Sequence, residues 1–271
     1  MARFTVFGSN GFVGRHLTRH LRRQGHEVIA ATRSTMPKPD TMIGHAIFCI
    51  GITANFRNEP EATVESQVFV LTDILKRYRA ESFLYLSSAR VYDGAVRTGE
   101  NAVLSVRPGL DHLYNLTKLT GEALVLAHDN AAFRAVRLSN AIGPGAKPVA
   151  FLPSVVEEAR RTGRIVFRTA PDSAKDYIAV EDAVAVMEQI ALRGGQRLYN
   201  VASGANTTND EIAVLVRKYL AAETVFAPDA PATRFPAIDI ARIREEFQFS
   251  PRTFEQTYVR SLEPEPSEVA T

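Results

Sequence analysis

Short apolar runs alternate with longer amphipathic stretches along most of the chain. Runs with the length of β-strands occupy residues 4–7, 28–31, 46–50, 83–86, 135–138 and 198–201. Apolar side chains recur at helical spacing in residues 13–23, 61–79, 113–128, 155–161, 180–192 and 210–220. This strand–helix alternation predicts an α/β fold, with a doubly wound parallel sheet that carries helices on both faces.

The connection between the second and third predicted strands is unusually short. Only residues 33–45, which include Pro37 and Pro39, separate the two runs. A complete strand–helix crossover needs a longer segment. A doubly wound sheet normally places another strand and helix here, so the sequence predicts a sheet that lacks one strand–helix unit after its second strand.

Composition and charge narrow the class of protein. The 271 residues are 45% apolar and 23% charged, which is typical of a globular protein and argues against disorder. With 32 basic and 30 acidic residues, the net charge of +2 gives no reason to expect nucleic acid or an anionic membrane as a partner. Cys49 is the only cysteine, so no internal disulfide forms. Residues 46–54 are too short to span a bilayer and residues 1–4 lack signal-peptide features, so we expect a cytoplasmic protein.

A glycine-rich loop lies between the first strand and the first helix. Gly8 allows the tight turn, Gly11 lets the backbone approach a pyrophosphate, and Gly14 lets helix and strand pack closely. The amino terminus of the helix then faces the anion. The spacing GxxGxxG in this position predicts a dinucleotide site. Its cofactor contacts come from Gly8, Asn10, Gly11, Phe12, Val13 and Gly14.

The end of the second strand indicates which dinucleotide binds. NAD-selective sites usually place Asp or Glu here to bind the ribose 2′-hydroxyl. This chain has Arg33, followed by Ser34. An arginine pairs well with a 2′-phosphate, so we expect NADP as the cofactor, with NAD as the alternative. The other interpretation of Arg33 is a solvated surface arginine.

A tyrosine and a lysine lie four positions apart on a predicted helix. Tyr114 and Lys118 therefore share one helical face. The ammonium and a cationic nicotinamide both favour the phenolate, which predicts a lowered pKa for Tyr114. Upstream, a strand ends in Ser87 and Ser88, and ligands bind at strand carboxyl ends in open parallel sheets. A serine there can hydrogen-bond the reacting oxygen, although a capping role is the alternative.

Together these motifs resemble the extended short-chain dehydrogenase/reductases, the NAD(P)-dependent nucleotide-sugar epimerase/dehydratase family. The resemblance covers residues 4–262. Beyond the glycine loop, it rests on residues 87–92 (Ser-Ser-x-x-Val-Tyr), 114–118 (Tyr-x3-Lys), 137–144, 175–182 and 199–204. It implies a Rossmann-type domain and a small α/β substrate-binding region.

The resemblance also implies roles for individual residues. Tyr114 is the general acid/base, Ser88 assists it, and Lys118 also holds the nicotinamide ribose. Further cofactor contacts are implied for Cys49, Ile50, Gly51, Thr53, Leu86, Ser87 and Leu138. Asn140, Lys175 and Arg234 fall where the family contacts the substrate's diphosphate, with Lys175 standing in place of a more usual arginine. The resemblance implies a sugar or nucleotide sugar as substrate.

Three reactions share this machinery: epimerisation, dehydration and keto reduction. The sugar 4,6-dehydratases of the family carry an Asp-Glu pair just after the catalytic serine or threonine. Ala89 and Arg90 stand there, and neither side chain exchanges protons near neutral pH, so we expect no 4,6-dehydratase activity. One interpretation of Arg90 is that it holds a substrate carboxylate or phosphate. The alternative is an outward-facing arginine that pairs with a surface acid.

Several expectations concern organisation and function class. The dinucleotide-binding domain comprises residues 1–139 and about 176–200, the substrate region 140–175 and 201–262, and a disordered tail 263–271. Asp172 and Lys175 are expected in a loop over the cleft. The resemblance implies a homodimer through residues 61–79 and 113–128. No Cys/His spacing suggests a metal. The alternatives are a ketoreductase for a small non-nucleotide substrate and a non-catalytic dinucleotide-binding sensor or assembly subunit.

Overall fold

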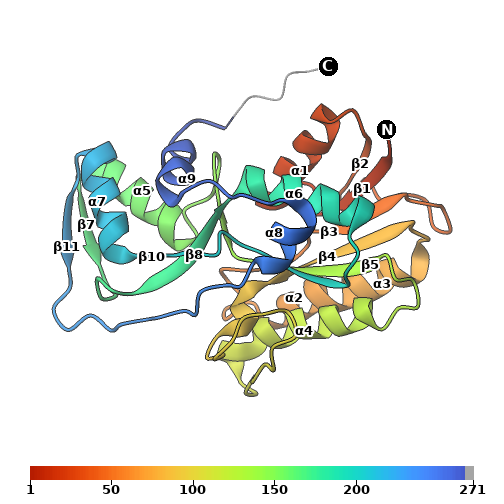
Figure 1. Ribbon diagram of the computed structural model, residues 1–271, viewed down its shortest axis with the longest axis horizontal. Coiled ribbons are helices and arrows are strands. Elements are labelled where there is room, and N and C mark those ends of the chain that lie inside the picture. Colours follow the sequence, from red (N-terminus) through yellow and green to blue (C-terminus); the bar gives the residue numbers. More distant parts are fainter. Residues whose placement is uncertain (266–271) are drawn as a thin grey trace.

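A parallel six-stranded sheet forms the centre of the larger half of the molecule (Figure 1). This computed structural model describes residues 1–265. The strands lie in the order β2-β1-β3-β4-β5-β9. Their bounds are β1 Arg3–Phe7, β2 Glu27–Ala31, β3 His45–Phe48, β4 Ser82–Ser88, β5 Phe133–Leu138 and β9 Leu198–Val201. The predicted α/β fold class and its parallel sheet are confirmed.

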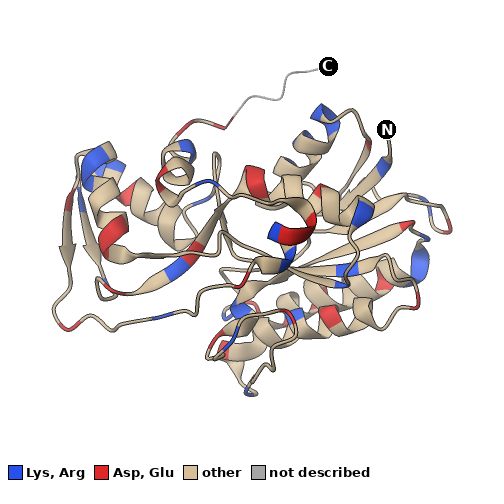
Figure 2. Cartoon of the chain, in the orientation of Figure 1, with Lys and Arg blue, Asp and Glu red and all other residues tan. Residues whose placement is uncertain are grey.

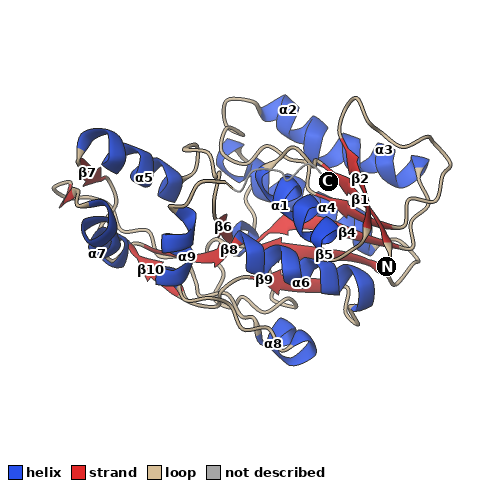
Figure 3. Ribbon diagram, turned by 90° about the horizontal axis from the view of Figure 1, so that it is seen from above, coloured by secondary structure: helices blue, strands red, loops and turns tan. Residues whose placement is uncertain are grey.

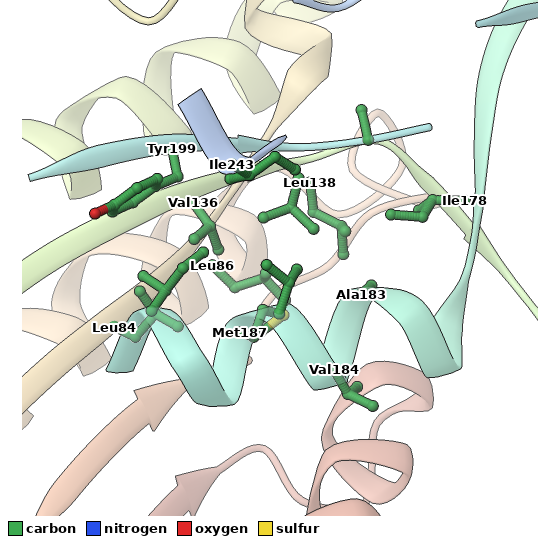
Figure 4. Close-up of a cluster of buried hydrophobic side chains, with 14 of the residues drawn as sticks. Leu84, Leu86, Val136, Leu138, Ile178, Ala183, Val184, Met187, Tyr199 and Ile243 are labelled. Carbon is green, nitrogen blue, oxygen red and sulfur yellow. The ribbon is translucent and has the colours of Figure 1, made fainter. Parts of the chain in front are cut away.

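Helices cover both faces of this sheet, because successive strand side chains point to opposite sides. On one face lie α1 (Phe12–Arg23) and α6 (Val180–Arg193), and on the other lie α2 (Pro60–Val64), α3 (Val70–Arg77) and α4 (Leu113–Leu126) (Figure 1). A π-helical turn, Glu65–Phe69, joins α2 to α3. Figure 4 shows Met187 of α6 close to Leu84, Leu86 and Val136, with Ala183 further along the same helix toward Leu138 and Ile178. The alternating neighbours Phe83, Tyr85 and Ala135 face the opposite core.

As the short connection predicts, the sheet has no strand–helix unit between β2 and β3. Residues 33–44 form no strand and no helix beyond an isolated bridge, Met42 to Arg79, and β2 is the edge strand. The amides of Asp40 and Ile43 donate to the carbonyls of Arg77 and Arg79, each at 2.9 Å. The connection therefore runs past the end of α3 and returns directly to β3.

The smaller region lies at one end of the sheet (Figure 3). It contains two small sheets, one ordered β10-β8-β6 and one pairing β11 with β7. Their strands are β6 Asn140–Ile142, β7 Arg164–Phe167, β8 Ala174–Ala179, β10 Asn206–Thr208 and β11 Glu223–Phe226. The helices of this region are α5 Phe151–Thr162, α7 Asn209–Leu220 and α9 Phe254–Ser261, whereas α8 Ala241–Phe247 lies beside β9 and α6 of the larger half.

Sequence periodicity detected only part of this smaller region. Strands β6, β7, β8, β10 and β11 are only three to six residues long, too short for a clear period-two pattern. Lys175 lies in β8 and not in the expected loop. Helix α8, within the segment predicted for the substrate region, packs Ile243 and Phe247 against the same core as α1 and α6.

The carboxyl-terminal segment differs from the expectation of a disordered tail over residues 263–271. Glu265 accepts hydrogen bonds from Arg15 at 2.7 Å and Arg19 at 3.0 Å. The expectation is therefore wrong for residues 263–265, because paired charges attach them to α1. Residues 266–271, the rest of the predicted tail, lie outside the described residues.

Surface charge agrees with the near-zero net charge. In the view of Figure 2, basic and acidic residues are interspersed over helices and loops. Within residues 1–265, no helix has both the length and the apolar character needed to cross a membrane.

A buried ion pair joins the centre of the sheet to α4. The Arg137 guanidinium on β5 donates to both carboxylate oxygens of Glu122 on α4, with the shortest distance 2.7 Å. Glu122 also accepts from the Ser87 hydroxyl at 2.5 Å, and Arg137 donates to the Tyr92 hydroxyl at 2.8 Å. Tyr92 in turn donates to Asn200 on β9 at 2.9 Å. The network fixes β4, β5, β9 and α4 in register.

Replacing Arg137 with methionine leaves the Glu122 carboxylate buried without its ionic partner. We expect Arg137→Met to lower the free energy of unfolding by about 3–5 kcal/mol. The double variant Glu122→Met/Arg137→Met removes both charges and should recover much of this loss. Urea unfolding followed by circular dichroism measures both. A double variant at least as unstable as the single one would contradict this account.

Candidate active site

Two glycines of the loop between β1 and α1 are required by its geometry. Gly8 has φ +81°, a conformation that L side chains rarely adopt, and a Cβ there would lie 3.0 Å from the backbone of Cys49. A Cβ at Gly14 would collide with the Gly8 carbonyl oxygen. The loop is therefore a tight cradle that places the start of α1 at the carboxyl end of β1.

The amino terminus of α1 fits an anionic ligand. Gly11 is its N-cap and supplies no side-chain hydrogen bond, and the first turn holds no acidic residue. The first amides of a helix point outward and carry partial positive charge, which favours a pyrophosphate. Asn10 and Gly11 are exposed, whereas Phe12 and Val13 pack partly against the core. The cradle therefore fits the phosphates of a dinucleotide, held by Gly8, Asn10, Gly11 and the amides that follow.

At the end of β2, both Arg33 and Ser34 are exposed. The Thr32 hydroxyl lies 3.1 Å from that of Ser34 and 2.7 Å from that of Thr35, which donates to the Ala30 carbonyl. These bonds order the turn. Among the described residues, no carboxylate pairs with the Arg33 guanidinium.

The three residues predicted to be catalytic converge at the carboxyl end of β4. Ser88 ends this strand, and Tyr114 and Lys118 face it from α4, only 5% and 4% exposed. The Lys118 ammonium donates to the Leu86 carbonyl at 2.8 Å and lies 5.8 Å from the Tyr114 ring centre. The proton-transfer groups are thus brought together in a site largely shielded from water.

Burial controls the ionisation of this cluster. Burial raises the pKa of Tyr114, although a hydrogen bond with Ser88 and the charge of Arg90 oppose the shift. The expected lowering of this pKa is therefore wrong for the protein alone. Burial also lowers the pKa of Lys118 to about 8, against the opposing influence of Cys49 and Glu122.

The segment after β3 lies against Lys118. A Cβ at Gly51 would be 3.4 Å from the Lys118 ammonium. Ile50 and Cys49 are partly buried, and burial raises the pKa of the Cys49 thiol to about 12, so the thiol stays neutral. Thr53 is exposed. The segment predicted to line the cofactor site is thus adjacent to the catalytic lysine.

Sequence patterns missed Gln67, which supports this segment. It lies in the π-helical turn, is fully buried, and donates to the Ile52 carbonyl at 2.8 Å. It accepts from the Thr117 hydroxyl of α4 at 3.1 Å. Gln67 therefore ties the segment after β3 to the helix that carries Tyr114 and Lys118. The sequence signal that could have identified Gln67 is a glutamine among the apolar positions of the helix predicted over residues 61–79.

Ser87, Leu86 and Leu138 form the floor of the site. The Ser87 hydroxyl donates to Glu122 and so belongs to the buried network, and a cofactor contact of Ser87 stays a prediction for its other atoms. Leu86 provides its carbonyl to Lys118, and its side chain packs with Leu138 in the core beneath.

Arg90 points inward, toward Tyr114. Its guanidinium carbon lies 5.6 Å from the Tyr114 ring centre and 4.9 Å from that of Phe56. Its backbone amide donates to the Ser88 hydroxyl at 3.2 Å, and its carbonyl accepts from Asn115 at 3.2 Å. The outward-facing alternative is therefore wrong. Phe56 lies in a loop between predicted elements, so its place beside Tyr114 had no periodic signal.

Of the predicted substrate residues, Lys175 and Asn140 lie on the paired strands β8 and β6, whereas Arg234 is turned toward solvent. Lys175 on β8 lies 5.9 Å from the Phe151 ring centre, and burial and the charge of Arg90 lower its pKa. Asn140 is exposed, and its side chain donates to the Asp176 carbonyl at 2.8 Å. The Arg234 side chain is 75% exposed and pairs with Asp172, so the structure does not bring its guanidinium to Tyr114.

A cavity of about 310 Å³ adjoins Lys175 in the smaller region. Aromatic and aliphatic side chains line much of it, including Phe151, Ile165, Phe167 and Tyr177. A mostly apolar pocket with a few polar groups suits an organic ligand. The sequence did not identify it because its walls come from α5, β7 and β8, which meet only in the folded chain.

Fold and site together define an α/β enzyme built around a dinucleotide cradle. A family model described as the NAD dependent epimerase/dehydratase family matches residues 4–61 and 53–202. The chain belongs to that family, and the resemblance to the extended short-chain dehydrogenase/reductases is confirmed.

Individual relatives are distant. A dTDP-glucose 4,6-dehydratase of Streptomyces griseus is 26% identical over 189 residues, 67% of this chain and 57% of the relative. The chain thus spans less than two thirds of that relative's length. The structure of MoeE5 with UDP-glucose and NAD superposes with a TM-score of 0.80 at 18% identity, covering 96% of this chain and 97% of the other. RMD from Pseudomonas aeruginosa with NADPH gives 0.78 at 22% identity, covering 96% and 98%.

These relatives leave the reaction open. A 4,6-dehydratase is among them, so the expectation that Ala89 and Arg90 exclude dehydration is not supported. The similar structures hold NAD or NADPH, which supports a nicotinamide dinucleotide without selecting between the two.

The low pKa of Lys118 predicts a pH-dependent stability. An unfolded lysine keeps its proton up to its ordinary pKa of 10.5, whereas the folded one releases it near 8. Between these values the unfolded state binds more protons, so the free energy of unfolding rises with pH, by at most ~1.4 kcal/mol per unit from this group. Lys118→Met should remove this rise in urea unfolding at pH 7.5, 8.5 and 9.5. An unchanged slope in that variant would refute the assignment, and Lys76→Met, an exposed lysine on α3, is the control.

Proposed function

We propose that the protein is a nicotinamide-dependent oxidoreductase or epimerase that acts on a sugar hydroxyl or keto carbon, with Tyr114 as general acid/base. The observation that carries the proposal is the convergence of Ser88, Tyr114 and Lys118 beside the glycine cradle. A module that only bound a dinucleotide, as a sensor or assembly subunit would, has no need of such a buried proton-transfer group.

Each residue of the cluster has a distinct task. As the phenolate, Tyr114 takes the proton from the substrate hydroxyl, and as the neutral phenol it donates that proton to the carbonyl oxygen in the reverse direction. The Ser88 hydroxyl, hydrogen-bonded to Tyr114, steadies the reacting oxygen. Lys118 places a positive charge below the Tyr114 ring, which favours the phenolate as proton transfer proceeds. Shielding by Phe56 and Arg90 keeps water away from the proton path.

A nicotinamide, when bound, supplies hydride chemistry at this site. Gly8, Asn10, Gly11 and the first turn of α1 would hold its pyrophosphate, residues 49–53 and Leu138 its nicotinamide half, and Lys118 its ribose. Arg33 and Ser34 at the end of β2 favour NADP because they present a guanidinium and a hydroxyl without a carboxylate. A structurally similar protein, RMD, holds NADPH.

The proposed substrate is a nucleotide sugar. The apolar cavity that Lys175 helps to line offers a place for a nucleobase, and Asn140 and Lys175, on the paired strands β6 and β8, are candidates to hold the diphosphate. Similar structures hold UDP-glucose and UDP-glucuronic acid. A small keto substrate is the second candidate, because it needs only Ser88, Tyr114 and Arg90.

A homodimer is proposed through α2–α3 and α4, where Phe69 and Leu124 are exposed.

Replacing Tyr114 with phenylalanine tests the catalytic assignment. Tyr114→Phe should lower kcat by roughly 10²- to 10⁴-fold while the dissociation constant for NADPH stays the same, because only the proton-transfer group is lost. Tyr85→Phe is a matched control, since the buried Tyr85 hydroxyl has no hydrogen-bond partner among the described residues. Product analysis of the wild type separates epimerisation, dehydration and reduction. Full turnover by Tyr114→Phe would refute the mechanism.

Removing the Arg33 guanidinium tests the cofactor preference. Arg33→Gln should weaken NADPH binding by roughly 10- to 100-fold, since one charge-assisted contact with the 2′-phosphate is lost. NADH binding should change little. Titration calorimetry with both cofactors measures this, and Arg22→Gln, an exposed arginine on α1, is the control. A wild-type protein that binds NADH more tightly than NADPH would overturn the preference.

A further inference from the structure

Arg90 is an arginine with no anionic partner beside the catalytic tyrosine. It is half-buried, and among the described residues no carboxylate pairs with its guanidinium. Desolvation of an unpaired guanidinium is unfavourable, and burial lowers the pKa of Arg90 accordingly. Binding of a ligand that supplies the missing negative charge beside such a group is therefore favourable, because it offsets this desolvation cost.

A second arginine, Arg57, packs against the same aromatic ring as Arg90 but is paired with a carboxylate. Arg57 lies 4.5 Å from the Phe56 ring centre, close to the 4.9 Å of Arg90. Its guanidinium, however, donates to Asp111 at 2.6 Å and is about half exposed. Phe56 therefore stacks with two arginines, of which one is neutralised by the protein and the other is left to the site.

A second cation, Lys175, interacts electrostatically with Arg90. Lys175 on β8 lines the cavity of the smaller region, with its ammonium 5.9 Å from the Phe151 ring centre, and the charge of Arg90 contributes to lowering its pKa. Asp93 acts electrostatically on both cations and Asp111, the partner of Arg57, acts on Arg90, but among the described residues neither carboxylate forms an ion pair with Arg90 or Lys175. Arg90 and Lys175 come from the two halves of the protein, so an anion that contacted both would bridge the halves.

We propose that Arg90, assisted by Lys175, binds a carboxylate on the substrate's own sugar ring, beside the carbon whose oxygen contacts Tyr114. This proposal rests on the proposed function. A ring whose hydroxyl reaches the Tyr114 oxygen also comes within reach of the Arg90 guanidinium, so the anion belongs to that ring and not to a distant diphosphate. A planar guanidinium matches a planar carboxylate with two parallel hydrogen bonds. The substrate class is therefore a nucleotide-linked uronic acid.

The Arg90 side chain can be replaced without breaking the hydrogen bonds that Arg90 makes, so the assignment can be tested in a folded variant. The Arg90 amide donates to the Ser88 hydroxyl and the Arg90 carbonyl accepts from Asn115, and both bonds use main-chain atoms of Arg90, so Arg90→Gln keeps them. Arg57→Gln removes a guanidinium from the same aromatic ring and is the matched control. Unchanged NADPH binding in both variants shows that the cofactor half remains folded.

Titration calorimetry on the NADPH-loaded protein compares UDP-glucuronic acid with UDP-glucose. The wild type should bind the acid roughly 10- to 100-fold more tightly, as expected for a charge-assisted contact. Arg90→Gln should abolish most of that difference by weakening binding of the acid, and Arg57→Gln should preserve it. Equal affinities in the wild type, or an equal loss for both sugars in Arg90→Gln, would overturn the proposal.

A second arm uses ligands that lack the nucleoside. Glucuronic acid 1-phosphate is compared with glucose 1-phosphate and with glucose 1,6-bisphosphate. Preference for the acid here, with no binding of either UDP-sugar, supports the role of Arg90 and contradicts the nucleotide part of the proposed function. Preference for the bisphosphate over the acid assigns a ring phosphate and overturns the carboxylate. Binding of none of these ligands contradicts both proposals.

Discussion

The buried pair of Glu122 and Arg137 is the interaction on which the site depends. It joins α4 to β5, and its side branches reach Ser87 on β4 and, through Tyr92, Asn200 on β9. Ser88 follows Ser87, and Tyr114 and Lys118 lie on the helix that Glu122 fixes. A shift of α4 along the sheet would separate the phenol from the serine. Two charges out of water are costly in isolation, so their retention is better understood as a means of setting register than as a source of stability.

Desolvation has a second consequence in the same place. Burial makes the Tyr114 phenol a weaker acid and the Lys118 ammonium a stronger one. Both groups are therefore biased toward neutrality, and the positive charge of Arg90 acts against that bias at Tyr114. A negatively charged substrate group on Arg90 would reduce this influence, so substrate binding and proton affinity at Tyr114 are electrostatically coupled.

The sequence predicted the parts of this structure that follow from local pattern. The apolar strand runs, the glycine spacing and the Tyr114–Lys118 interval each reflect one element, and the missing unit after β2 follows from counting residues. The features that the sequence did not predict arise between elements. Phe56 and Gln67 gain their roles by contact with α4, and the apolar cavity is assembled from three elements. The hydrogen bond from the Ser87 hydroxyl to Glu122 had no local signal because the two residues are distant in sequence. Burial likewise reversed the expected shift of the Tyr114 pKa.

The shortened connection after β2 leaves that strand at the edge of the sheet, with Arg33 and Ser34 exposed at its end. An adenosine held there meets few walls, so its residence time depends on the pyrophosphate cradle and on charge. Charge-dependent contacts weaken as salt increases. Under the proposed function, we therefore expect the cofactor to exchange readily with solution. Ready exchange suits a reductase, which must replace its oxidised cofactor with a reduced one after every turnover. It suits an epimerase less well, because an epimerase keeps one cofactor through many turnovers.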